Sequence, residues 1–141
     1  MSGHIPFLSE DAKIVVEAPT VAGTSTVDFT VLDLAYFSNV LFIVRLGTPA
    51  ANNNIRARQD IASGGAFADV TGSLVSHATN NVLMLDLKRS DKRYVRLRVT
   101  RPSSTTIDFV AAILYGARNK PATQLTTTTF KQIVGALDGV A

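Results

Sequence analysis

The chain of 141 residues contains no cysteine and no tryptophan, and only 18% of its residues are charged. The lack of cysteine excludes a disulfide framework and a thiolate-ligated metal site. No apolar stretch reaches the roughly 18–20 residues that a membrane-spanning helix needs. The N-terminal residues include Glu10 and lack a basic start followed by an apolar run. We therefore expect no signal peptide and no membrane span, and a protein that is made in the cytoplasm.

Sequence patterns of catalytic and cofactor sites are missing as well. His4 and His77 show none of the spacings typical of metal binding, and we expect both to be ordinary surface residues. There is no Gly-x-Ser-x-Gly nucleophile elbow, no phosphate-binding loop and no calcium-binding loop. A pair of catalytic carboxylates assembled by the fold stays open, although no pair of acids stands out. The sequence predicts a non-enzymatic protein without metal or cofactor.

Short segments with a two-residue period fill most of the chain, and turns rich in Gly, Pro, Asn and Ser separate them. In the clearest segment, Val95, Leu97 and Val99 are expected to face a core, while the residues between them face outward. Seven or eight such strands predict an all-β fold, an antiparallel β-sandwich or jelly roll, whose strand order stays open. The predicted strands are 13–18, 23–34, 39–46, 55–60, 67–72, 82–87, 94–100 and 106–115.

Extended arms are predicted on both sides of this sandwich. Residues 1–12 show no periodicity and form the N-terminal arm, residues 13–116 the β-domain, and residues 117–141 a C-terminal arm that ends in a possible short helix. The segment 106–115 is hydrophobic on both faces, so we expect a helix, an arm or a neighbouring subunit to cover its outer face. The candidate contact residues of the arms are Ile5, Phe7, Phe130, Ile133 and Leu137.

Charge is distributed unevenly along the chain. The formal net charge is +3, but residues 1–40 hold five acids and one base. Seven of the fourteen Lys and Arg residues lie between Lys88 and Arg101. A chain with an acidic front and a basic remainder is able to pair with its own copies, or to present its basic side to an anionic partner.

Arginines at alternate positions of two predicted strands, with a tyrosine at the edge, form the strongest candidate site. Such a face is able to bind single-stranded nucleic acid, to pair with Asp60, Asp86 or the acids of the front segment, or to contact an acidic patch on another protein. Because a net charge of +3 is modest for nucleic-acid binding, we favour a protein-facing surface. Its residues are Arg56, Arg58, Tyr94, Arg96 and Arg98.

Several stretches, taken in order, resemble small virion proteins of tailed bacteriophages, among them the β-sandwich decoration (cement) proteins of the capsid. The resemblance covers about residues 25–124. It implies a virion protein that binds the lattice of the major capsid protein, stabilises the head, and forms a small homo-oligomer, usually a trimer. It implies no catalytic residue. The stretches are VLDLAYFSNVLFIV (31–44), RQDIASGGAFADVTG (58–72), SDKRYVRLR (90–98), VAAILYG (110–116) and KPATQ (120–124).

Two other functions remain open. One is a self-assembling coat protein whose arginine strip binds nucleic acid. The other is a tail or baseplate module that binds host glycan. For the glycan module the aromatic content is thin, because tryptophan is absent and the tyrosines are limited to Tyr36, Tyr94 and Tyr115.

Overall fold

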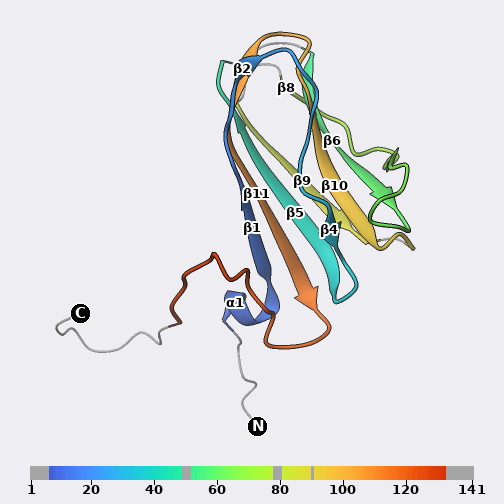
Figure 1. Ribbon diagram of the computed structural model, residues 1–141, viewed down its shortest axis with the longest axis vertical. Coiled ribbons are helices and arrows are strands. Elements are labelled where there is room, and N and C mark those ends of the chain that lie inside the picture. The colour runs from blue at the N-terminus through green and yellow to red at the C-terminus, as the bar shows by residue number, and fades with distance from the viewer. Residues whose placement is uncertain (1–6, 49–51, 78–80, 90, 133–141) are drawn as a thin grey trace, which may run out of the picture.

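The computed structural model describes residues 7–48, 52–77, 81–89 and 91–132, which form two antiparallel sheets packed face to face (Figure 1). Sheet A has the order β1-β11-β5-β9, with β2 also paired to β11. Sheet B has the order β3-β10-β6-β7, with β4 paired to β10 and β8 to β6. The elements are α1 (Leu8–Asp11), β1 (Lys13–Glu17), β2 (Thr20–Gly23), β3 (Val27–Asp28), β4 (Leu32–Asp33), β5 (Phe37–Leu46), β6 (Asn53–Asp60), β7 (Ala68–Asp69), β8 (Val75–His77), β9 (Val82–Lys88), β10 (Tyr94–Thr100) and β11 (Thr105–Ala117).

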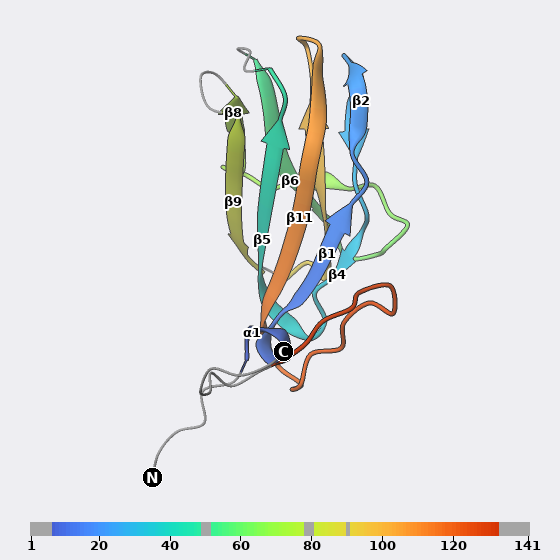
Figure 2. The ribbon, with the colours of Figure 1, turned by 90° about the vertical axis from the view of Figure 1, so that its left-hand side faces the viewer.

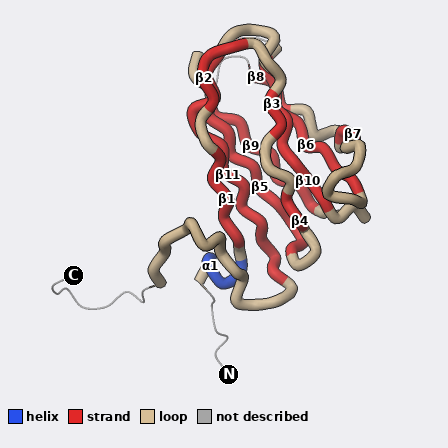
Figure 3. Tube along the Cα trace, viewed as in Figure 1, coloured by secondary structure: helices blue, strands red, loops and turns tan. Residues whose placement is uncertain are grey.

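The strand order is that of a jelly roll. The strands β1 and β2 lie along the same side of β11, β3 and β4 along the same side of β10, and β7 and β8 along the same side of β6 (Figure 3). When each pair is counted as one interrupted strand, sheet A reads 1-8-3-6 and sheet B reads 2-7-4-5. This is a double-sheet Greek-key arrangement. The predicted antiparallel β-sandwich is confirmed, and its strand order is now defined.

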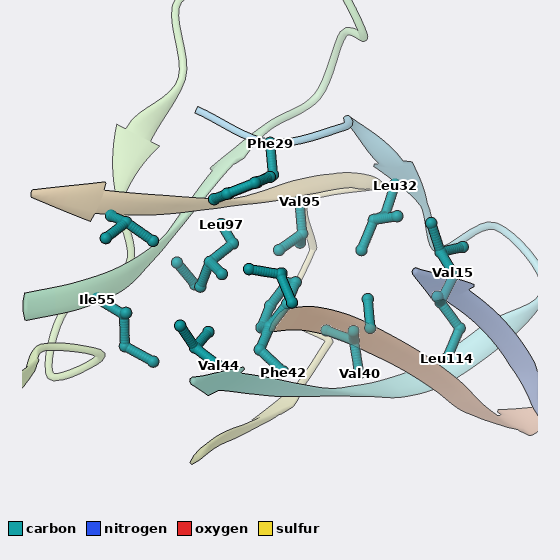
Figure 4. Packing of buried hydrophobic residues seen from close by; sticks show 14 of the residues in the cluster. Val15, Phe29, Leu32, Val40, Phe42, Val44, Ile55, Val95, Leu97 and Leu114 are labelled. Carbon is teal, nitrogen blue, oxygen red and sulfur yellow. The ribbon is translucent and has the colours of Figure 1, made fainter. Parts of the chain in front are cut away.

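The core lies between the sheets because the strands alternate as the sequence predicts. On β10, Val95, Leu97 and Val99 are 1%, 1% and 0% exposed. From sheet A, Val40 and Phe42 of β5 point toward them (Figure 4). Burying each such side chain contributes about 1.5–3 kcal/mol. The inner face of each sheet is therefore fixed, and every function must use the outer faces, the edges or the ends.

The predicted strand 23–34 is wrong as a single element. The chain leaves sheet A at the end of β2 and crosses to sheet B, where β3 and β4 each pair only briefly with β10. Between them, the Phe29 amide still donates to the Leu97 carbonyl at 2.9 Å. Alternation alone does not reveal a change of sheet, because the residues keep a two-residue period on both sides of the crossing.

The described parts of the two arms pack against each other at one end of the sandwich (Figure 2). The side chain of Gln124 donates to the carbonyls of Ser9 and Ala12 at 3.0 and 2.5 Å, and it accepts from the Ile14 amide at 3.1 Å. An ion pair of 3.1 Å joins Lys120 to Asp11. The short helix α1 was not predicted. The division of the chain at residues 12 and 117 stays a prediction.

The expectation that His77 is a surface residue is wrong. It ends β8 and is 0% exposed, opposite the equally buried Asn53. Among the described residues, neither ring nitrogen has a hydrogen-bond partner. Burial lowers the pKa of His77, because the charged imidazolium is disfavoured away from water. His4 lies outside the described residues.

We expect acid to destabilise the fold through His77, well before the carboxylates titrate. The unfolded chain takes up a proton near pH 6.5 that the folded chain resists, so the free energy of unfolding should fall as the pH drops below about 6.5. Urea unfolding between pH 8 and pH 5 measures this slope. His77→Gln, which does not titrate, should flatten the slope. An equally steep slope in His77→Gln would contradict the assignment.

Candidate interaction surfaces

The five candidate residues on strands lie together on the outer face of sheet B. The register of β10 and β6 places Arg98 opposite Arg56 and Arg96 opposite Arg58, so four arginines form a block on the two central strands. Like charges directly opposite each other destabilise a sheet. The block therefore needs acceptors close by, and the flanking strands supply them.

Aspartates on both sides neutralise much of this block. Arg98 forms a bidentate pair with Asp28 of β3, at 2.7 and 2.8 Å. On the other side, Asp69 of β7 accepts from Arg56 at 2.8 Å and from Arg58 at 3.0 Å. The arginine hydrogen bonds hold the pKa of both carboxyl groups below its ordinary value. The arginine strip is therefore a charge-paired surface.

The remaining members of the strip are also engaged within the chain. Arg96 donates to the Phe29 carbonyl from two nitrogens, at 3.0 and 2.8 Å, and its guanidinium lies 5.6 Å from the centre of the Phe67 ring. The ring of Tyr94 is contacted by Arg93 at 5.2 Å. Arg93 in turn pairs with Asp33 through two bonds of 2.8 Å. A nucleic acid would have to compete for each of these groups.

The structure thus contains cross-strand ion pairs of the kind the sequence left open. The acids are Asp28 and Asp33 of the front segment, together with Asp69. Neither Asp60 nor Asp86 forms such a pair with the strip in the part of the chain that is described. The sequence missed Asp69 because its position beside β6 depends on the pairing of β7, which no local pattern fixes.

The outer face of sheet A has the opposite character. One row of neighbouring residues across all four strands is entirely apolar: Val16, Ala111, Ile43 and Met84. Large apolar side chains remain in water on this face, with Val16 at 60%, Met84 at 55% and Phe109 at 41% exposure. An antiparallel sheet that faces solvent normally alternates apolar-in and polar-out. Sheet A breaks that rule on its two central strands.

Figure 2 shows this face toward the viewer, and no described segment crosses in front of β5 and β11. The predicted cover of segment 106–115 by a helix or an arm is therefore not found among the described residues, and cover by a neighbouring subunit stays a prediction. Two charged residues flank the apolar row. Arg45 is exposed, and Asp86 accepts from the Tyr115 hydroxyl at 2.6 Å, a bond that raises the pKa of Tyr115.

The candidate residues of the arms are only partly described. Phe7 is half-buried at the start of α1, and Phe130 is 53% exposed outside any helix. The remaining candidates, Ile5, Ile133 and Leu137, lie outside the described residues, and so does most of the predicted C-terminal helix.

A groove runs along the open edge of the sandwich, between β1 and β4. One part has a volume of about 370 Å³ and is lined by Val15, Leu32 and Leu125, among others. The adjoining part, of about 470 Å³, includes Tyr36. Tyr94 and Tyr115 lie elsewhere, on the outer faces of sheets B and A. The three tyrosines thus do not form one aromatic platform.

Within the described ranges, no group of three or more His, Cys, Asp or Glu side chains is arranged to hold a metal ion. No described helix is long and apolar enough to cross a membrane.

The fold is similar to those of phage-derived proteins. No protein-family model and no curated protein matches the chain. The crystal structure of PBSX exported protein XepA aligns with a TM-score of 0.57 and 19% identity, over 96% of this chain and 47% of that protein. SPBc2 prophage-derived protein YomS aligns with a TM-score of 0.49 and 12% identity, over 80% and 98% of the two chains. The chain thus spans about half the length of XepA, with which it shares the β-sandwich fold.

Proposed function

We propose that this chain is a non-enzymatic structural protein of a phage virion, of the capsid decoration type. It binds the lattice of the major capsid protein as a small homo-oligomer and stabilises the head. The observation that carries the proposal is the contrast between the two outer faces: sheet A presents an apolar row, and sheet B presents paired arginines and aspartates. A rigid domain with two such faces is suited to hold two protein neighbours at once.

The charged face of sheet B is assigned to the shell. Its guanidinium and carboxylate groups are held in fixed positions by the sheet, so they offer directional hydrogen bonds to a polar capsid surface. Each site needs only modest affinity, because an oligomer engages several equivalent sites of the lattice at once. The phage-derived structural neighbours and the resemblance of residues 25–124 to decoration proteins support this assignment.

Co-sedimentation with purified heads that lack the protein tests this function. We expect saturable binding by the wild-type chain. The double variant Tyr94→Ala, Arg58→Gln should weaken binding about tenfold, equivalent to about 1.4 kcal/mol. The matched control, Tyr36→Ala, Arg118→Gln, changes an exposed tyrosine and an exposed arginine away from sheet B and should bind normally. A wild-type chain that stays in the supernatant would overturn the proposal.

The same preparation distinguishes the coat-protein alternative. Shells containing nuclease-protected RNA after expression in bacteria would favour a nucleic-acid-binding coat protein. We expect small oligomers without RNA, because the arginines of sheet B already have acceptors within the chain.

A further inference from the structure

We propose that the outer face of sheet A binds the same face of a second copy of this chain, forming a two-fold symmetric pair. Apolar outer faces of two sheets packing against each other reproduce the way in which sheets A and B already pack in the core, about 10 Å apart. This pairing does not depend on what sheet B binds. It therefore goes beyond the proposed function and can be tested apart from it.

The area is sufficient for a specific contact. Four strands spaced about 4.8 Å apart, over four rows of outward residues, give about 500 Å² of flat sheet in each copy. A pair would bury about 1,000 Å², the size at which specific interfaces begin. The side chains that would leave water include Val16, Met84, Val82 and Phe109, which are 60%, 55%, 46% and 41% exposed.

The charges on this face select a second copy as the partner. On β5, Arg45 lies one row to one side of the apolar row; on β9, Asp86 lies one row to the other side. A two-fold axis along the apolar row places Arg45 opposite Leu41 of the second copy. Since Leu41 is paired with Asp86 on the neighbouring strand, about 5 Å away, the arginine reaches that carboxylate. Symmetry forms this ion pair twice.

The apolar residues match under the same operation. Residues on the axis, Ile43 and Met84 among them, meet their own copies, and Phe109 lies opposite Ile113 of the second copy. An isologous interface needs a patch that complements itself. This face meets the requirement, because it supplies apolar groups along the axis and both members of an ion pair on opposite sides of it.

Light scattering after size exclusion tests the pair. The wild-type chain should have twice the chain mass. Ile43→Asp places two carboxylates face to face on the axis and should weaken association about 100-fold or more, since like charges across an interface cost several kcal/mol. Ile61→Asp makes the same chemical change at a site that is 66% exposed on the sheet B side, and it should stay dimeric. If Ile43→Asp does not fold, as judged by circular dichroism, Met84→Lys replaces it.

A charge-exchange cycle makes the test specific. Arg45→Asp alone and Asp86→Arg alone each set like charges against each other and should yield single chains. The double variant restores both ion pairs with reversed polarity and should recover the dimer. A wild-type chain with single or triple chain mass would overturn the two-fold pair, as would a double variant that stays dissociated. Binding of the Tyr94→Ala, Arg58→Gln variant to heads reports separately on the proposed function.

Discussion

Replacement of Arg101 by methionine is expected to lower the free energy of unfolding by about 3–5 kcal/mol, because each backbone carbonyl left without a donor in a buried site costs about 1–3 kcal/mol. Arg101 is only 2% exposed. Its guanidinium donates to the carbonyls of Ser25, Val21 and Thr105 at 3.0, 2.9 and 2.7 Å, and to the Ser25 hydroxyl at 2.8 Å. Methionine fills similar space without any donor.

The location of these acceptors explains why the loss should be large. Val21 belongs to β2 and Thr105 to β11, while Ser25 lies in the segment that crosses from sheet A to sheet B. One side chain thus ties the crossing to the edge of sheet A.

Urea unfolding of the wild-type chain, Arg101→Met and Arg101→Lys measures the effect. Lysine keeps the charge but lacks the planar fork, so it should recover only part of the loss. Arg118→Met, at an exposed position, serves as the control and should change stability by less than about 0.5 kcal/mol. A loss of under about 1 kcal/mol in Arg101→Met would show that water replaces the guanidinium.

Arg101 also shows how far the sequence pattern reached. Its charge placed it in a basic surface, although its position continues the inward series of Val95, Leu97 and Val99. The two-residue period was therefore the better guide, and it held even for an arginine. The same period correctly placed the outward arginines of β6 and β10.

The partners of those arginines required the tertiary structure. Asp28 precedes Arg98 by 70 residues, and the two meet only because β3 pairs with β10. A jelly roll is built from such long-range pairings, which no local periodicity reveals. In contrast, the apolar character of segment 106–115 on both faces was readable directly, because it depends on residue types alone. The sequence thus predicted both faces of sheet A but not the contacts of sheet B.

Two phenylalanines on opposite faces of sheet A give the second large prediction. Phe42 points into the core and is 1% exposed, so Phe42→Ala should cost about 3–5 kcal/mol. The melting temperature should fall by about 10 °C at every protein concentration. Phe109 lies on the outer face and is 41% exposed. Phe109→Ala should cost less than about 1 kcal/mol in a dilute sample, where the chain is single.

Raising the protein concentration separates the two faces. Association stabilises the folded chain in proportion to the logarithm of the ratio between concentration and dissociation constant. The wild-type melting temperature should therefore rise with concentration, whereas that of Phe109→Ala should rise less, so the gap between them widens. Thermal unfolding at about 2 and about 200 µM measures this, a range that gives up to about 2.7 kcal/mol of linkage. A gap that stays constant would mean that Phe109 faces water at all concentrations. A widening gap with an unchanged Phe42→Ala deficit would locate the self-association on the outer face of sheet A, where the sequence alone already required a cover.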